Sequence, residues 1–293
     1  TRPPALPTVA DRAAISVLIP VRNESANLAA CLASVAWCDD VVVVDSGSTD
    51  GTPALARAAG ARVVDFRWNG GFPRKKNWAL ASVAWKHEWI FIIDADERCT
   101  PPLAAAMRAA LQQHTYAGYY VNRRFWFLDG WLNHCGYYPS WNLRFFRHAL
   151  GRYEKPPGAD SAGSGDNEVH EHVELQGTTG YLDGEMEHYA FPDVATWVEK
   201  HNRYSNWEAR LQVEGAATDA AGLDPALARK RRLRRLAWHL PFRPSLRFLY
   251  HYVWRAGFLD GYRGFVFCRL MGWYEFLNAA KARELRRTVR PRS

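Results

Sequence analysis

Short runs of apolar residues recur along the first 100 residues, and longer segments with helical spacing separate them. The apolar runs are residues 15–19, 41–44 and 89–93. Runs of four or five such residues predict strands that are buried on both faces of a parallel sheet. The segments 25–36, 50–59 and 74–86 predict helices. Because strands and helices alternate, we expect an α/β fold with a doubly wound, mostly parallel sheet.

The pattern changes after residue 100. Further strands are predicted at 62–64, 118–127, 142–146 and 170–175, and a stretch rich in glycine and proline at 156–168 predicts a loop. Large apolar residues recur every seven positions over 193–214, which predicts a long helix.

Positive charge is concentrated at the C-terminal end of the chain. The net charge is +8, and residues 225–293 hold 17 of the 38 lysines and arginines but three of the 30 acidic residues. Apolar residues between 246 and 257 follow helical spacing beside a stripe of arginines at 243, 247 and 255. Such a basic amphipathic pattern favours an anionic membrane surface, although the stripe could instead pack back on the rest of the protein. No apolar run is long enough to predict a spanning helix.

The cysteine pattern argues against a disulfide framework or a zinc cluster. The chain has five cysteines, and no two of them are in C-x-x-C spacing. We therefore expect free thiols and a reducing, cytoplasmic compartment.

Carboxylates follow the predicted strands, where ligands bind in open α/β sheets. Asp94 and Asp96 leave the third strand together, and such a pair can share a divalent cation, Mg²⁺ or Mn²⁺, with substrate phosphates. Asp45 follows the second strand and could accept the imide N–H of uracil, or could instead cap the next turn. Lys75, Lys76 and Asn77 open a helix, where cations and free N–H groups suit a diphosphate.

These segments resemble the nucleotide-sugar domain of family 2 glycosyltransferases with the GT-A fold. The matching segments are 15–24 (ISVLIPVRNE), 43–52 (VVDSGSTDGT), 71–77 (GFPRKKN) and 93–97 (IDADE). The resemblance implies that a UDP-sugar contacts Pro20, Val21, Arg22, Glu24, Asp45, Lys76, Asn77, Asp94 and Ala95. It also implies that Asp94 and Asp96 hold the metal, and Asp96 is expected to be essential for catalysis.

A narrower resemblance extends over most of the chain. Segments 127–136, 141–146, 169–172 and 200–205 are similar to the bacterial lipopolysaccharide-core glucosyltransferase branch. That similarity implies an inverting transfer of a hexose, glucose, from a UDP-hexose to a lipid-anchored oligosaccharide at the inner face of the plasma membrane. The expected parts are then a tail (1–14), a GT-A domain (15–224, with the nucleotide-sugar part up to about residue 100) and a basic helical membrane-surface extension (225–293).

An inverting transfer needs a general base beside the acceptor hydroxyl. Glu171, within His170-Glu171-His172, is the first candidate, and Asp166 and Glu168 are rivals. His172 could complete the metal shell. Asp129, Trp131, His134 and Trp141 could line an acceptor pocket, although aromatic residues more often lie in a core.

Two other classes of function remain open at this point. A nucleic-acid-binding protein could use the basic C-terminal segment, but no nucleic-acid-binding motif accompanies it and the rest of the chain is net negative. A nucleotidyltransferase would also use a metal and a nucleotide. Such an enzyme usually carries a glycine-rich loop after the first strand, where this chain has Pro-Val-Arg-Asn-Glu. Because no nucleic-acid-binding motif is present, we expect no nucleic acid partner.

Replacing the candidate base should separate binding from turnover. Glu171→Gln should keep UDP-sugar binding and lower kcat by about 10²- to 10⁴-fold, because the amide is nearly isosteric but cannot take the proton. Steady-state kinetics and calorimetric titration with the donor measure the two quantities. A kcat within a few-fold of the wild type would move the base to Asp166 or Glu168.

Overall fold

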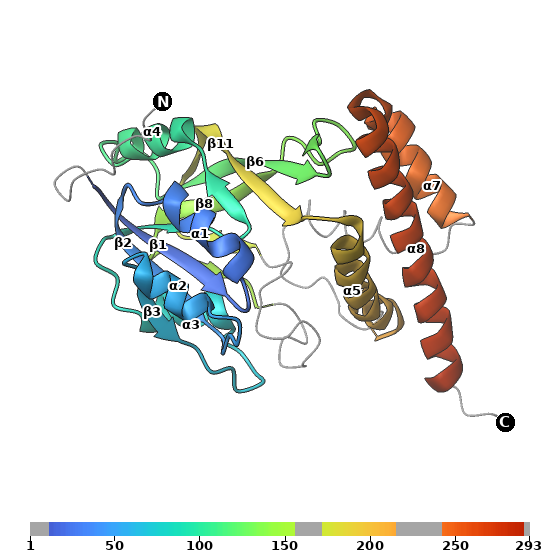
Figure 1. Ribbon diagram of the computed structural model, residues 1–293, viewed down its shortest axis with the longest axis horizontal. Coiled ribbons are helices and arrows are strands. Elements are labelled where there is room, and N and C mark those ends of the chain that lie inside the picture. The colour runs from blue at the N-terminus through green and yellow to red at the C-terminus, as the bar shows by residue number, and fades with distance from the viewer. Residues whose placement is uncertain (1–11, 156–171, 215–241, 290–293) are drawn as a thin grey trace. The chain divides into compact units, whose positions relative to one another are not determined.

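The computed structural model describes residues 12–155, 172–214 and 242–289 (Figure 1). The chain divides into two compact units. The first contains residues 1–125 and 139–190, and the second contains 126–138 and 191–293. Each unit is described on its own below.

One large sheet forms the first unit, in the strand order β3-β2-β1-β4-β8-β6-β11-β5. Its first four strands are parallel: β3 (Arg62–Asp65), β2 (Cys38–Asp45), β1 (Ala13–Val21) and β4 (Trp89–Ile92). The others are β8 (Trp141–Arg147), β6 (Gly118–Phe127), β11 (Thr179–Phe191) and β5 (Glu97–Cys99). β8 pairs antiparallel with both β4 and β6, and β5 pairs antiparallel with β11. The expected α/β fold is confirmed. The parallel strands are the first four in this order, β3, β2, β1 and β4.

Apolar burial explains why these segments form the centre of the sheet. All four residues of β4 are buried, as are seven of the nine residues of β1. Helices α1 (Ser25–Ser34), α2 (Thr52–Ala58) and α4 (Pro101–Ala110) contribute Leu28, Ala56 and Leu103 to the core on one face. Helix α3 (Lys75–Ser82) contributes Ala79 and Leu80 to the core on the other face. The sheet is therefore covered on both sides, as a doubly wound fold requires.

A small two-stranded sheet packs on the same face as α3. It pairs β9 (Gly151–Tyr153) with β10 (Val173–Leu175) in antiparallel order. Gly118 of β6 allows the close approach, since a Cβ there would lie 2.7 Å from side-chain carbons of both Leu175 and Phe146. The strand expected at 170–175 is thus present from residue 173, and residues 170 and 171 lie outside the described part.

Helices make up most of the described residues of the second unit. These helices are α5 (Val194–Glu214), α7 (Arg243–Leu249), a π-helical turn η3 (Tyr250–Trp254), a 3₁₀ turn η4 (Gly257–Asp260) and α8 (Gly261–Val289). Trp197 of α5 is buried and stacks on His201 with ring centroids 3.5 Å apart. Burial lowers the pKa of His201 to about 4, so this imidazole is neutral at pH 7. Lys281 of α8 donates to Ser205 Oγ of α5 over 2.7 Å, which ties the two long helices together.

The segment 126–138, which carries the short strand β7 (Gly130–Trp131), also belongs to this unit. Asp260 accepts hydrogen bonds from the backbone N–H groups of Asn133 and His134 at 3.2 and 2.9 Å. The buried thiols of Cys135 and Cys268 lie 3.6 Å apart, and all five cysteines are free. This unit joins α5 and the segment 126–138 to the C-terminal helices, and the separate basic extension expected over 225–293 stays a prediction.

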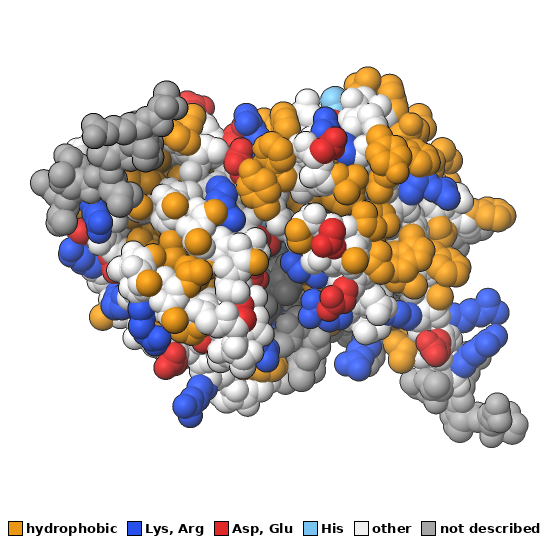
Figure 2. All heavy atoms as spheres, in the orientation of Figure 1, with side chains coloured by type: hydrophobic (Ala, Val, Ile, Leu, Met, Phe, Trp, Pro, Cys, Tyr) orange, Lys and Arg blue, Asp and Glu red, His pale blue; other side chains and the backbone are white. Residues whose placement is uncertain are grey.

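The apolar stripe expected between 246 and 257 forms several short helical pieces, and it faces two ways. His251 and Gly257 are buried, whereas Leu246, Val253 and Trp254 are exposed. Apolar side chains gather on the surface of α7 and α8 in Figure 2. Within the described residues, no helix has the length and hydropathy needed to cross a membrane.

Candidate active site

A tight turn after β4 fixes the positions of the two predicted metal-binding aspartates. The backbone N–H of Asp94 donates to Glu97 Oε2 at 2.8 Å, and the N–H of Glu97 donates to the Asp94 carbonyl at 2.9 Å. Glu97 is fully buried at the start of β5, and Ala95 is buried within the turn. This reciprocal pair holds Asp94 and Asp96 at the carboxyl end of the parallel strands.

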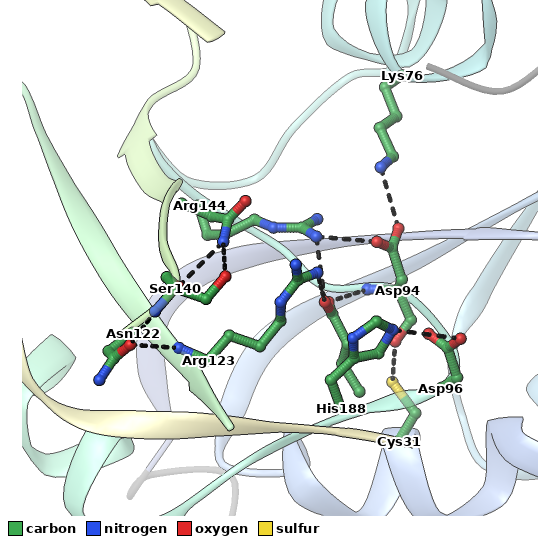
Figure 3. Close-up of polar contacts among 11 residues, drawn as sticks. Cys31, Lys76, Asp94, Asp96, Asn122, Arg123, Ser140, Arg144 and His188 are labelled. Carbon is green, nitrogen blue, oxygen red and sulfur yellow. Dashed lines mark hydrogen bonds and ion pairs between the residues drawn. The ribbon is translucent and has the colours of Figure 1, made fainter. Parts of the chain in front are cut away.

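Two cations each contact one oxygen of the Asp94 carboxylate (Figure 3). Lys76 Nζ lies 3.0 Å from Oδ1, and Arg144 Nη2 lies 2.9 Å from Oδ2. Burial raises the pKa of Asp94, but these two positive charges outweigh it and hold the pKa well below its ordinary value. Asp94 is therefore ionised, and its negative charge is shared between α3 and β8.

Arg144 also connects this carboxylate to a second one below it. Its Nη2 lies 3.1 Å from Oε1 of the buried Glu97, and Arg123 Nη1 lies 3.3 Å from the same oxygen. Arg144 Nη1 is buried and has no hydrogen-bond partner among the described residues. Glu97, Arg123 and Arg144 were not among the predicted site residues, although Arg144 interrupts the apolar run 143–146.

A histidine from a distant strand lies beside Asp96. His188 of β11 has its Nε2 3.6 Å from Asp96 Oδ2, and the edge of its ring packs against Phe125. Its Nδ1 is buried without a hydrogen-bond partner in the described part of the chain. An imidazole and a carboxylate thus face each other at the strand ends, and no local sequence pattern predicts this pairing.

The expected metal set of Asp94, Asp96 and His172 is not assembled. Among the residues that the structure describes, no three His, Cys, Asp or Glu side chains are grouped to hold a metal ion. His172 is exposed and precedes β10, where its N–H donates to Glu154 Oε1 at 3.3 Å. His172 lies beside the small sheet because β10 pairs with β9 and does not join the main sheet, and its role as a metal ligand stays a prediction.

The residues expected to contact the nucleoside lie at the ends of β1 and β2. Val21 and Asp45 are partners in the parallel register, and Lys75 Nζ donates to the Val21 carbonyl at 3.0 Å. Pro20 precedes Val21 in β1, and Arg22 is exposed just beyond the strand. These residues therefore share one edge of the sheet with Asp94.

Loop contacts occupy the carboxylates of this edge. Asp45 Oδ2 accepts the N–H groups of Gly47 and Ser48 at 3.0 Å each, and Oδ1 accepts the Ser48 hydroxyl. Glu24 Oε2 accepts the Asn27 side-chain amide at 2.9 Å. Asp45 thus performs the turn-capping role that was its alternative, and the nucleoside contact stays a prediction.

Asn77 has a structural partner at each end of its amide. Its Nδ2 donates to the Tyr153 carbonyl and its Oδ1 accepts the Tyr153 N–H, both at 2.9 Å. The side chain therefore joins α3 to β9, a geometry that does not favour the diphosphate contact expected for it.

The four residues expected to line an acceptor pocket are divided between the two units. Trp141 belongs to the first unit, and Asp129, Trp131 and His134 belong to the second. Asp129 pairs with Arg263 at 3.3 Å, and His134 Nδ1 lies 2.9 Å from Asp260 Oδ1. The candidate base Glu171 and its rivals Asp166 and Glu168 lie outside the described residues.

Comparisons of the sequence and the structure with known proteins find a matching family model and several similar proteins. The model of glycosyl transferase family 2 matches residues 16–165. The lipopolysaccharide core biosynthesis glycosyltransferase LpsC of Rhizobium meliloti (strain 1021) is 31% identical over 282 residues, which cover 91% of each chain. Among solved structures, a mannosyltransferase from Pyrobaculum calidifontis in complex with GDP-Man and Mn²⁺ aligns over 94% of this chain and 88% of its own, with a TM-score of 0.50 and 16% identity. Glucosyl-3-phosphoglycerate synthase from Mycobacterium tuberculosis, solved with Mn²⁺, UDP-Glc and phosphoglyceric acid, aligns over 43% of this chain and 50% of its own at 27% identity, with a TM-score of 0.31.

The buried ion cluster predicts a large difference between two arginines of β8. Arg144→Met should lower the free energy of unfolding by about 3–5 kcal/mol, because it leaves two carboxylates without their shared guanidinium. Arg147→Met, the matched control on the same strand, removes a partly exposed pair with Glu88 and should cost about 1 kcal/mol or less. Urea denaturation of both variants measures the difference. Equal losses would show that the Arg144 cluster contributes no more than a surface pair.

Proposed function

Because the chain belongs to glycosyl transferase family 2, we propose that it transfers a hexose, glucose, from a UDP-sugar to a lipid-linked glycan such as the lipopolysaccharide inner core. The configuration at the transferred carbon would be inverted. The similarity to a lipopolysaccharide core glycosyltransferase over nine-tenths of both chains supports the acceptor class. The observation that carries the proposal is the cluster of cations and carboxylates at the carboxyl ends of the parallel strands.

Charge in this cluster favours a departing diphosphate. Lys76, Arg123 and Arg144 supply three positive charges against the two carboxylates of Asp94 and Glu97. The unsatisfied Nη1 of Arg144 is a donor that an anionic oxygen can use. Positive groups fixed in place before the reaction stabilise the charge that develops on the leaving group.

The chemistry of Asp96 and His188 fits a divalent cation. A carboxylate oxygen and an imidazole nitrogen suit Mn²⁺, and a hard cation bound by few protein groups takes its remaining ligands from water and substrate phosphates. We assign Asp96 and His188 as the protein ligands, while Lys76 and Arg144 hold Asp94. When bound, the cation would neutralise charge on the diphosphate.

The proton of the acceptor hydroxyl needs a base on the face opposite the leaving group. We retain Glu171 for this role, with Asp166 and Glu168 as rivals. As the base removes the proton, the acceptor oxygen attacks the anomeric carbon and the bond to UDP breaks, so the charge passes to the diphosphate. The nucleoside edge is formed by the end of β1 and the residues just after it, namely Pro20, Val21, Arg22 and Glu24. We keep Asp45 as the acceptor for the uracil imide, with its carboxylate positioned by the loop N–H groups.

Family membership favours this reaction over the two other hypotheses. A nucleotidyltransferase would cleave between the phosphates, and a nucleic-acid-binding protein would have no use for the ion cluster. Hydrolysis of a panel of UDP- and GDP-sugars without acceptor tests the assignment. UDP-glucose should be hydrolysed faster than the other donors, and preferential hydrolysis of GDP-sugars would contradict it.

Removal of either cation ligand should abolish Mn²⁺ binding. Asp96→Asn and His188→Ala should each lose the bound-Mn²⁺ signal in electron paramagnetic resonance titrations. The rate of transfer should also fall, because the transition state loses on the order of several kcal/mol of stabilisation. Asp39→Asn, at the opposite end of β2, is the control and should bind Mn²⁺ like the wild type. Undiminished transfer in excess EDTA would refute the metal role.

A lipid-linked acceptor requires the enzyme to work at a membrane surface, and the second unit has a suitable surface. Its large exposed apolar side chains on α7, η3, η4 and α8 are here called the apolar patch (Figure 2). The patch consists of Phe242, Leu246, Leu249, Tyr250, Val253, Trp254, Phe258, Leu259, Tyr262, Phe265, Trp273 and Phe276. Exposed arginines at 247, 255 and 269 lie among these residues in the chain.

We propose that the apolar patch and its arginines bind the anionic inner face of the bacterial plasma membrane from the cytoplasm. Trp and Tyr favour the interface between headgroups and acyl chains, and each arginine near an anionic surface contributes roughly 1 kcal/mol. Large exposed apolar side chains that gather on one face mark interaction surfaces (Figure 2). The enzyme would thus lie on the membrane without crossing it.

Point variants test the membrane contact better than truncation, because α8 packs against α5. The double variant Trp254→Ala/Tyr262→Ala should bind vesicles of phosphatidylglycerol and phosphatidylcholine at least about tenfold more weakly, since each buried aromatic contributes on the order of 1.5–3 kcal/mol. Val194→Ala, an exposed apolar position of the same unit outside the patch, is the control.

Vesicle co-sedimentation measures this binding. Binding should be weaker on neutral phosphatidylcholine vesicles and should fall as salt is added. If the double variant and the wild type bind equally, or if the wild type does not bind, the membrane assignment is wrong.

A further inference from the structure

Aromatic side chains from three neighbouring strands meet on one face of the large sheet. They are Tyr120 of β6, Trp141 of β8 and Tyr181 of β11. The rings of Tyr120 and Tyr181 stack with centroids 5.2 Å apart, and Trp141 meets Tyr181 edge-to-face at 4.9 Å. We call these three residues the aromatic platform.

The exposure of this platform sets it apart within the first unit. Trp141 is 41% exposed and Tyr181 is 64% exposed. They are the only exposed large apolar side chains among the described residues of that unit, and they touch each other. Single exposed aromatic residues are common on protein surfaces. Two that touch each other, and that are the only exposed large apolar side chains among the described residues of this unit, indicate a binding surface.

Hydrogen-bonding groups lie directly beside the rings. Asn122 is the partner of Trp141 in the antiparallel register, so the two side chains share a face. Asn122 Nδ2 donates to Glu185 Oε1 at 3.1 Å, and Glu185 pairs with Arg124. Asn122 Oδ1 accepts the Ser140 N–H at 2.8 Å, which fixes the amide (Figure 3).

The platform lies on the same strands as part of the proposed active site. Arg123 and Arg144 lie on the same two strands as Asn122 and Trp141 but point to the opposite face, toward Glu97 and Asp94. Trp141 and Arg144 are three residues apart, which is about 10 Å along a strand. Tyr120 packs against the core that also contains Leu80 of α3 and Tyr153 of β9, the strand beside Lys76.

The β9–β10 sheet on this face also leads to the candidate base. β10 begins two residues after Glu171, and His172 lies next to Glu154, which directly follows β9. The described residues that precede and follow this segment therefore lie at the small sheet on the same face as the platform.

We propose that the aromatic platform binds a sugar ring of the acceptor glycan. A pyranose has an apolar C–H face that packs on aromatic rings, and a rim of hydroxyls that Glu185 and Arg124 can bind, while the buried Asn122 holds Glu185 in place. Glu185 and Arg124 neutralise each other, which matches a neutral ring better than a phosphate. This inference rests on the proposed function, because it assumes that the acceptor is a glycan.

Ligand-observed NMR tests the platform in the full-length protein. The probe is the deacylated lipopolysaccharide core oligosaccharide of Rhizobium meliloti, the organism of the relative described above. Saturation transfer to the sugar protons should be clear for the wild type. Trp141→Ala and Tyr181→Ala should each weaken binding about tenfold or more, as truncation of a central aromatic contact does. Trp141→Phe keeps an aromatic ring and should stay within a few-fold of the wild type.

A second measurement separates this proposal from the proposed function. Hydrolysis of UDP-glucose without acceptor should be the same in the wild type and in the platform variants, while KM for the oligosaccharide rises. Undiminished glycan binding by Trp141→Ala, or no binding by the wild type, would overturn the platform. Absence of nucleotide-sugar hydrolysis by the wild type would instead overturn the proposed function. The two outcomes can be told apart because glycan binding, which the NMR experiment measures, does not require hydrolysis of the donor.

Discussion

The guanidinium of Arg144, shared between Asp94 and Glu97, is the interaction on which the proposed active site depends. Glu97 is fully buried, and a buried carboxylate is unfavourable unless it is paired and hydrogen-bonded. Arg144 and Arg123 provide the charge, and the backbone of Asp94 provides a hydrogen bond. Because these partners come from β8, β6 and the turn after β4, one ion cluster fixes how the antiparallel half of the sheet meets the parallel half. The same cluster leaves Lys76 and Asp94 at the edge where a nucleotide sugar would arrive.

The parallel half of the sheet could be predicted because its signal is local. The runs 15–19, 41–44 and 89–93 became β1, β2 and β4, since strands buried on both faces need apolar residues at every position. The position of Asp94 and Asp96 followed from the same rule. Helix α5 was also predicted from a local signal, the seven-residue spacing of its large apolar residues.

Long-range pairing explains what the sequence did not reveal. His188 reaches Asp96 because β11 pairs with β5 across about 90 residues, with His188 opposite Glu97. No periodicity encodes that register, so the nearer His172 looked equally suitable. The aromatic platform likewise needs β6, β8 and β11 to be neighbours, so the sequence pointed to Trp141 as an acceptor contact but not to its partners Tyr120 and Tyr181. Asn77 seemed a phosphate ligand because its partner, Tyr153, is 76 residues away.

The discontinuous second unit has a consequence for the growing polypeptide on the ribosome. Residues 126–138 are synthesised between β6 and β8, yet Leu132 and Cys135 are buried in a unit whose remaining residues begin at 191. Asp260, which accepts the N–H groups of Asn133 and His134, and Cys268, which lies against Cys135, are made about 130 residues later. The sheet can therefore form during translation, but this segment keeps its apolar side chains and polar backbone without their native partners until α8 leaves the exit tunnel. The sheet of the first unit is therefore complete in the nascent chain long before the second unit can close.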